Sequence, residues 1–185
     1  MIQITDKQIQ ELNISPTTCV EWAKEAFVIK SDCQLPTKVH VHPQGNDFIT
    51  TMPCLLPLAE HKFGVKVVSR VNGRKPALKS SLMLYDSISG DLEAVMDANW
   101  ITSMRTGAVA TLAIKTFRKT NTKVYSLIGL GNIAHATMTC MLKEFENEHL
   151  FVKLLRYKNQ AESFVEDFAG YKNVTFSIAD NIEEW

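Results

Sequence analysis

The feature that most constrains this chain of 185 residues is a short apolar run followed by two closely spaced glycines and a small residue. The run occupies residues 124–134 and ends in Gly129, Gly131 and Ala134. In a strand–turn–helix unit, the first glycine permits a tight turn, the second lets the backbone approach a phosphate, and the small residue lets the helix lie close to the strand. The amides that open the helix face the anion. The pattern predicts a turn that holds a dinucleotide pyrophosphate; a tight turn in another α/β unit is the alternative.

The sequence after this turn predicts the rest of a nucleotide-binding half-domain. Apolar residues recur at helical spacing after Ala134, a second strand is expected at 150–155, a second helix at 159–169 and a third strand at 174–178. A βαβαβ order of this kind is half of a doubly wound domain. Asn159 with Glu162 fits a capping box, and Asn181 with Glu184 repeats the pattern just before the sequence stops. We therefore expect a chain truncated within its nucleotide domain.

The first part of the chain has a different pattern. A helix is expected from Ser15–Pro16 to about Lys30, and a helix at 99–117 has Asp97 or Asn99 as candidate caps and small residues such as Gly107 on its surface. Strands are expected in two hairpins and one further segment, at 38–42, 48–52, 65–71, 82–85 and 92–96. The fold class predicted is α/β: a mainly antiparallel α+β domain over 1–120, followed by a partial Rossmann-like domain over 121–185.

Composition argues against several classes of partner. The chain has 20 basic and 20 acidic residues and neither sign forms a block, so neither nucleic acid nor a membrane surface is indicated as a partner. No signal peptide and no apolar run of about 20 residues is present, and the four cysteines have no metal-ligand spacing, so a cytoplasmic location is expected. His40 and His42 share one face of a strand, but without a third ligand an exposed face is favoured over a metal site.

A second group of polar residues lies near the start of the helix expected at 99–117. Arg105 and Thr106 could hold a carboxylate or a phosphate, the arginine by a bidentate fork and the threonine by one hydrogen bond. The alternative is a surface arginine beside a threonine that bonds to its own helix. Spacing alone does not separate the two.

Several of these segments together resemble the ornithine cyclodeaminase and mu-crystallin family. The resemblance covers nearly the whole chain and rests on Met52–Pro53, Lys66 within 64–68, Ser89–Gly90, Asp97, Arg105–Thr106 and the Gly129-x-Gly131 turn. It implies a homodimer in which an antiparallel dimerisation and substrate domain is joined to a Rossmann domain that binds NAD or NADP.

The resemblance also implies roles for individual residues. Arg105 and Lys66 correspond to partners of the substrate carboxylate, and Lys38 stands where the family usually has an arginine, which makes its grip less directional. Thr106 corresponds to a contact of the cofactor phosphate. The glycine turn supplies the other cofactor residues: Gly129, Gly131, Asn132 and Ile133. No catalytic residue is assigned, because the aspartate that serves the cyclodeaminases corresponds to a position beyond residue 185.

The sequence favours NADP slightly over NAD. Domains that prefer NAD usually carry an acid at the end of the second strand to hold the ribose hydroxyls. Here Arg156 and Lys158 occupy that neighbourhood and could accept a 2′-phosphate. They could equally be solvated loop charges, so NAD stays open.

The activity that the resemblance implies first is conversion of ornithine to proline and ammonia, with hydride removed from and returned to Cα. The leading alternative is a reductase of cyclic imines or an amino-acid dehydrogenase, which would use the same cofactor and carboxylate sites. A third is a non-catalytic nucleotide-binding protein like mu-crystallin. The substrate in each enzymatic case is a small amino acid or imino acid.

Overall fold

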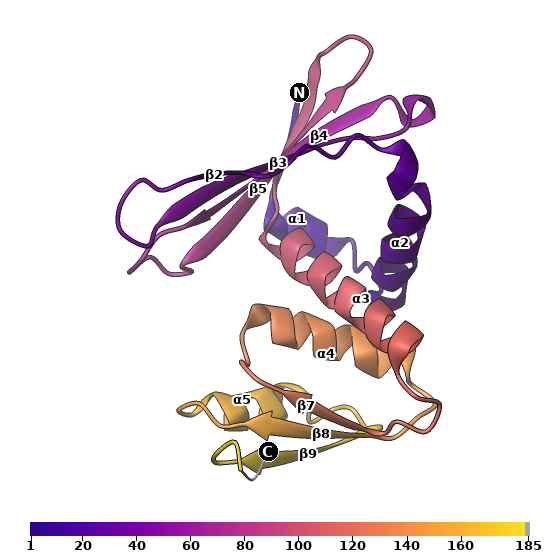
Figure 1. Cartoon of the computed structure of the whole chain (residues 1–185), viewed down its shortest axis with the longest axis vertical. Helices are drawn as coiled ribbons and strands as arrows, with labels where there is room; N and C mark the ends of the chain where they lie inside the picture. The colour runs from indigo at the N-terminus through magenta and orange to yellow at the C-terminus, as the bar shows by residue number, and fades with distance from the viewer. Residues whose placement is uncertain (184–185) are drawn as a thin grey trace. The chain divides into compact units, whose positions relative to one another are not determined.

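The computed structural model describes residues 1–183 and divides into two compact units (Figure 1). The first comprises 1–14 and 25–102, and the second comprises 15–24 and the chain from Ser103 onward. The division therefore falls inside a helix, at Thr102–Ser103. The boundary at 120/121 that separates a substrate role from a cofactor role stays a prediction about function.

The first unit is built on a six-stranded sheet with the order β1-β6-β5-β4-β3-β2. Its strands are β1 (Ile2–Ile4), β2 (Val39–Val41), β3 (Phe48–Leu55), β4 (Lys62–Arg70), β5 (Leu78–Asp86) and β6 (Leu92–Asp97), accompanied by α1 (Asp6–Glu11) and two 3₁₀ turns, η1 (Lys30–Asp32) and η2 (Leu58–Glu60). All neighbouring strands are antiparallel except β1 and β6, which confirms both expected hairpins. Strand β1 and helix α1 are too short to leave a periodic signal, so the sequence did not predict them.

The start of helix α3 (Asn99–Phe117) is fixed by a residue distant in sequence. The predicted caps have other partners: the Asn99 side chain accepts from the Ser80 amide at 2.8 Å, and Asp97 accepts from the Asp6 amide at 3.3 Å. The carboxylate of Asp6 in turn accepts from the Trp100 amide at 3.3 Å. The prediction of a local cap is corrected accordingly, since these bonds join α3 to the start of α1 and to the sheet.

The second unit contains a three-stranded parallel sheet with the order β7-β8-β9 (Figure 1). Chain order is β7 (Val124–Leu127), α4 (Asn132–Glu144), β8 (Leu150–Leu155), α5 (Gln160–Asp167) and β9 (Val174–Ala179), which confirms the predicted βαβαβ half-domain. Helix α2 (Pro16–Ile29) begins as expected, because the Ser15 hydroxyl accepts from the Thr18 amide at 3.0 Å.

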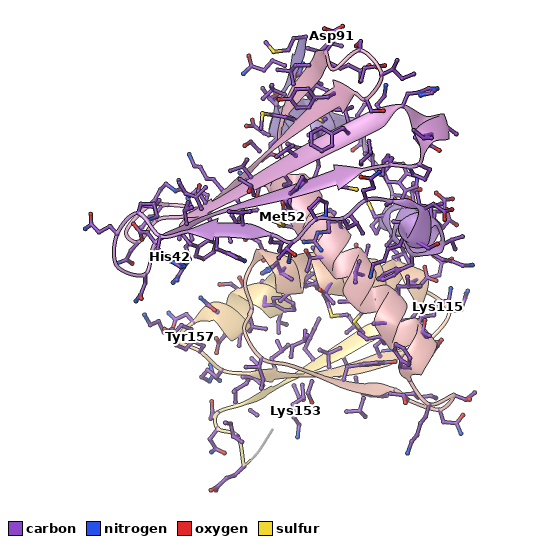
Figure 2. All side chains as sticks on the ribbon, turned by 45° about the horizontal axis from the view of Figure 1, so that its top comes forward. His42, Met52, Asp91, Lys115, Lys153 and Tyr157 are labelled. Atoms are coloured by element: carbon purple, nitrogen blue, oxygen red, sulfur yellow. The ribbon has the colours of Figure 1, made fainter. Side chains whose placement is uncertain are left out.

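The core of the second unit lies between the parallel sheet and helices α4 and α5. Alternate residues of β8, Leu150, Val152 and Leu154, are at most 1% exposed and pack in one cluster with Met138 and Phe164. The intervening residues of β8 point to the other face, where Phe151 is 46% exposed. Lys153, labelled in Figure 2, shares that face. Helices α4 and α5 therefore cover one face of this sheet and fix the positions of its strand ends from that side.

Helices α3 and α4 approach each other closely at a glycine. A Cβ built on Gly107 would lie 2.5–2.7 Å from backbone atoms of Ala136 and Thr137, which leaves no room for a side chain. Further along, the Thr111 hydroxyl donates to the Thr137 carbonyl at 3.4 Å, and Lys115 pairs with Glu144. The residue numbers of the contacting pairs increase together along both helices, so α3 and α4 run in the same general direction (Figure 1). This confirms the expectation that small residues of α3 admit another element.

We expect Gly107→Ala to destabilise the second unit by about 1–3 kcal/mol, because the backbone of α4 must move to admit the methyl group. A gain of about 1 kcal/mol in helix propensity only partly offsets that cost. Gly170→Ala is the matched control, since its Cβ would meet no atom within 4 Å. Urea unfolding of both variants measures the difference; equal stability of the two would contradict the close contact.

Candidate functional site

The predicted phosphate-binding turn connects β7 to α4. Gly129 has a φ of +81°, a backbone conformation that residues with a Cβ atom rarely adopt. It is the residue at which the chain turns out of the strand. Gly131 stands at the N-cap of α4 with extended dihedrals of −87° and −171°, and no side chain caps the helix there. The amides that open α4 are therefore left for an external acceptor, as an anion site requires.

Nothing in the described structure explains why residue 131 is a glycine. Its φ is negative, and a Cβ built on it would meet no protein atom within 4 Å. An alanine would fit this turn as it stands. A group that comes close to the backbone from outside, such as a dinucleotide phosphate, accounts for the missing side chain, and the turn therefore fits the cofactor.

The turn borders an open cavity of about 600 Å³ within the second unit. Three of the predicted cofactor residues, Gly131, Asn132 and Lys158, lie in its wall. The opposite wall is the start of α5, including Asn159, Gln160 and Ser163. The cavity thus joins the glycine turn to the carboxyl end of β8, which is where the ribose of a dinucleotide lies in doubly wound folds. Ile133, also predicted, is 49% exposed at the start of α4.

His135 and Asp167 are wall residues that the sequence analysis missed. The His135 Nδ1 lies 3.1 Å from the Gly131 carbonyl, and its Nε2 lies 2.9 Å from Asp167 Oδ2. Both partners are hydrogen-bond acceptors, and the ring can donate to either of them. The ring also packs on Phe164, with centroids 4.5 Å apart. His135 ties the glycine turn to α5, a contact that no local spacing could have revealed.

Arg156 is engaged by protein carboxylates. Its guanidinium pairs with Glu162 of α5 and with Asp180, which follows β9. The predicted capping box is corrected in both halves: Asn159 is the N-cap of α5 but its side chain makes no cap bond, and the Glu162 carboxylate pairs with the Arg156 guanidinium. The second predicted capping box, Asn181 with Glu184, includes a residue outside the described part of the chain. Within that part, the Asn181 side chain accepts from the Glu183 amide at 2.9 Å.

Lys158 has a different setting from Arg156. It lies in the wall of the cavity with a φ of +53°, and its ammonium sits 5.4 Å from the ring centre of Tyr157, labelled in Figure 2. None of the ion pairs among residues 1–183 involves Lys158. Of the two basic residues predicted to meet a 2′-phosphate, Lys158 is the one that faces the cavity.

Arg105 and Thr106 lie on α3 in the turn that ends at Gly107. Because α3 and α4 run in the same direction from the Gly107 contact, this turn lies toward the end of α4 that begins at Asn132. The Arg105 side chain is exposed and pairs with no carboxylate of the described chain, while Thr106 is half-buried. The second unit therefore brings a guanidinium to the same end as the glycine turn.

Lys38 and Lys66 fall in one row across the sheet of the first unit. Lys66 of β4 is paired with Met52 of β3, and extending the register of β2 by one residue places Lys38 opposite Met52 on the other side. Directly paired residues share a face, so both ammonium groups belong to the face that carries Met52, labelled in Figure 2. Two strand spacings, about 10 Å, separate their backbones.

The two histidines of β2 and its turn have protein partners. His40 Nδ1 lies 2.9 Å from the Thr50 hydroxyl, and His42 Nδ1 lies 3.1 Å from the Asp47 carbonyl. Residues 1–183 contain no group of three side chains able to hold a metal ion.

The parallel half-domain, its open glycine turn and the mixed sheet before it define a protein with a dinucleotide-binding architecture. The chain belongs to the ornithine cyclodeaminase/mu-crystallin family, whose model matches residues 1–184. Among curated proteins it is 28% identical over 141 residues to ketimine reductase mu-crystallin of Mus musculus, covering 74% of this chain and 43% of that one. It is also 28% identical over 149 residues to an alanine dehydrogenase of Archaeoglobus fulgidus, covering 77% and 45%.

Solved structures have the same fold. An archaeal alanine dehydrogenase dimer with bound NAD matches with a TM-score of 0.87 at 25% identity, covering all of this chain and 57% of that one. A Δ1-pyrroline-2-carboxylate reductase of Thermococcus litoralis, in complex with NADH and L-proline, matches at 0.85 and 26%, covering 100% and 58%. The chain thus spans less than half the length of the curated relatives named above. Within residues 1–183, no helix combines the length and apolar character needed to cross a membrane.

We expect Gly131→Ala to fold as stably as the parent and to weaken NADH binding by at least about tenfold, because its methyl group occupies space left for a phosphate. Gly129→Ala is the contrasting variant: its positive φ should cost about 1–2 kcal/mol of stability. Thermal unfolding and NADH fluorescence titration separate the effects. Unchanged binding by Gly131→Ala would show that no ligand comes close to the turn.

Proposed function

We propose that this chain supplies the nicotinamide-cofactor site and the carboxylate grip of an oxidoreductase that acts on the Cα–N bond of a small amino or imino acid. The single observation that carries this is Gly131, a glycine that the fold itself does not need, at the mouth of a cavity beside uncapped helix amides. The cofactor, when bound, accepts or supplies hydride; the protein binds and orients.

The residues divide between two tasks. The glycine turn, Asn132 and Thr106 hold the cofactor phosphates, and the His135 ring keeps the turn in place. Arg105, exposed and without a carboxylate partner, receives the substrate carboxylate. Lys38 and Lys66, to which the family resemblance gives the same role, share one face of the sheet in the first unit. Fixing the carboxylate at several points orients Cα, which is the contribution that positioning makes to a hydride transfer.

Reduction of an imino acid, or the reverse dehydrogenation, is favoured over the cyclodeamination of ornithine that the resemblance first implied. The relatives at 25–28% identity are named for ketimine reduction, alanine dehydrogenation and pyrroline-carboxylate reduction. The matching cyclodeaminase structures are only 18–20% identical and support the fold alone. Both chemistries use the same carboxylate grip, so this preference rests on the relatives rather than on a residue of the site.

A single set of assays distinguishes the candidates with the 185-residue chain. NADH consumption with a cyclic ketimine carboxylate, or with pyruvate and ammonia, supports the reductase or dehydrogenase. Ammonia release from ornithine without net NADH change supports the cyclodeaminase instead. NADH binding without turnover of any of these substrates supports a nucleotide-binding protein of the mu-crystallin kind, and absence of NADH binding contradicts all three.

We expect Arg105→Ala to weaken binding of the carboxylate substrate by about 10–100-fold, the loss expected for a charged hydrogen-bond pair. Affinity for NADH should change by less than about threefold, because the guanidinium is assigned to the substrate. Arg105→Lys, which keeps the charge but loses the fork, should fall between the two. Separate titrations with NADH and with a substrate-like carboxylate measure this; equal losses of both would place Arg105 at the cofactor.

We further propose NAD(H), rather than the NADP that the sequence slightly favoured, as the preferred cofactor. The guanidinium of Arg156 already pairs with Glu162 and Asp180, so a 2′-phosphate would have to displace a carboxylate to reach it. With Lys158 of the cavity wall counted as well, the charges of Arg156, Lys158, Glu162 and Asp180 cancel, so this region offers no net positive charge to a 2′-phosphate. Solved family relatives with bound NAD or NADH support the same choice.

We expect the double variant Glu162→Gln, Asp180→Asn to bind NADPH at least about tenfold more tightly, because it frees the Arg156 guanidinium for a phosphate. NADH affinity should change little. Adding Arg156→Gln should abolish the gain. If Arg156→Gln alone weakens NADPH binding of the parent more than tenfold, Arg156 is the phosphate partner that the sequence indicated.

A further inference from the structure

Cys33 and Cys54 form a thiol pair in the first unit, whereas the residues assigned to the cofactor belong to the second unit. Cys33 follows η1, and Cys54 lies near the end of β3. The residues that come next in the chain, Gln34 and Leu55, form an antiparallel bridge with amide-to-carbonyl distances of 2.9 and 3.0 Å in both directions. The backbone therefore holds the two cysteines at fixed places on neighbouring segments.

The two thiols are neighbours, and both are partly accessible to solvent. The bridge between Gln34 and Leu55 brings their segments together, the Cys33 thiol lies 3.4 Å from the Ile29 carbonyl, and both residues are half-buried. Burial raises the pKa of the Cys54 thiol, and the adjacent Cys33 raises it further. Cys33 is therefore the better placed sulfur to attack, and Cys54 the better placed to resolve.

The remaining cysteines make an internal comparison. Cys19 and Cys140, in the second unit, are both buried, at 6% and 0% exposure. Burial raises the pKa of Cys140 to about 12, and the nearby Cys19 contributes in the same direction. These two behave as small apolar side chains, so we expect thiol reactivity at the half-buried pair, Cys33 and Cys54.

We propose that Cys33 and Cys54 are a modification site: a dithiol that a small-molecule disulfide such as oxidised glutathione converts to an internal disulfide. The Cys33 thiolate attacks one glutathione sulfur and expels the other as a thiolate, leaving a mixed disulfide. The Cys54 thiolate then attacks the Cys33 sulfur and expels the second glutathione. The two protons lost by the cysteines pass to the two glutathione thiolates, so one disulfide is reduced as one is formed.

The bond would close the loop 33–54, which contains β2 and Lys38. Strand β2 is three exposed residues at the edge of the sheet and is paired only with β3 in the described chain. A covalent closure limits the freedom of this segment, because it removes open conformations of the loop. Oxidation would therefore restrain Lys38 at its position across the sheet from Lys66. This effect does not depend on which reaction the protein catalyses.

Peptide mapping of the 185-residue chain tests the proposal. After incubation with oxidised glutathione and quenching with an alkylating agent, we expect a linked Cys33–Cys54 peptide and the loss of two reactive thiols. Cys19 and Cys140 should be alkylated only after denaturation. Dithiothreitol should restore both thiols, and amide exchange of Val39–Val41 should be slower in the oxidised protein than in the reduced one.

Single variants identify the pair independently of cofactor binding. Cys33→Ser and Cys54→Ser should each give at most one glutathione adduct and no internal bridge, whereas Cys19→Ala should still bridge. Should either serine variant fail to fold, the map of the parent protein decides alone. Separate adducts on Cys33 and Cys54, a bridge between other cysteines, or no reaction would overturn the proposal, and none of these outcomes bears on the assignment of the cofactor site.

Discussion

The contact of Gly107 with the backbone of α4 is the constraint on which the candidate site depends. It lets α3 lie directly against Ala136 and Thr137, and it sets which turn of α3 faces the start of α4. Arg105 and Thr106 occupy that turn, so a glycine with no chemical role fixes the two residues to which we assign binding roles. Any side chain at position 107 would move Arg105 relative to the glycine turn, because helices α3 and α4 would have to separate. The residues proposed to bind substrate and cofactor in the second unit are therefore coupled by packing rather than by a bond.

The sequence predicted those parts of the fold whose causes are local. The glycine turn, the βαβαβ order and the two hairpins follow from residue spacing within about 20 positions, and all are found. Contacts between distant segments had no such signal. Asp6 caps a helix that begins at Asn99, Asp167 reaches His135 across two elements, and Asp180 with Glu162 engages Arg156. The sequence alone offers many possible partners for each charged side chain, and only the folded chain shows which one it contacts.

The two glycines of the turn separate requirements of folding from requirements of binding. Gly129 is needed by the backbone, since its φ of +81° is unfavourable for any residue with a side chain. Gly131 adopts dihedrals open to every residue and faces empty space. A selective pressure for stability alone would act on the first and ignore the second. Both glycines belong to one sequence motif, and only their backbone dihedrals and surroundings in the folded chain show that their roles differ.

The charges around the end of β8 show that a basic residue of a cofactor motif can also have a structural role. A basic residue after the second strand suggests a 2′-phosphate, but the same guanidinium can serve to join three elements. Arg156 links the end of β8 to α5 and to the residue after β9, so its partners are already protein carboxylates. A phosphate would gain a partner here only by leaving one of those acids unpaired. We therefore attribute the proposed preference for NAD(H) to the energy of an existing ion-pair network, and not to the presence or absence of an arginine alone.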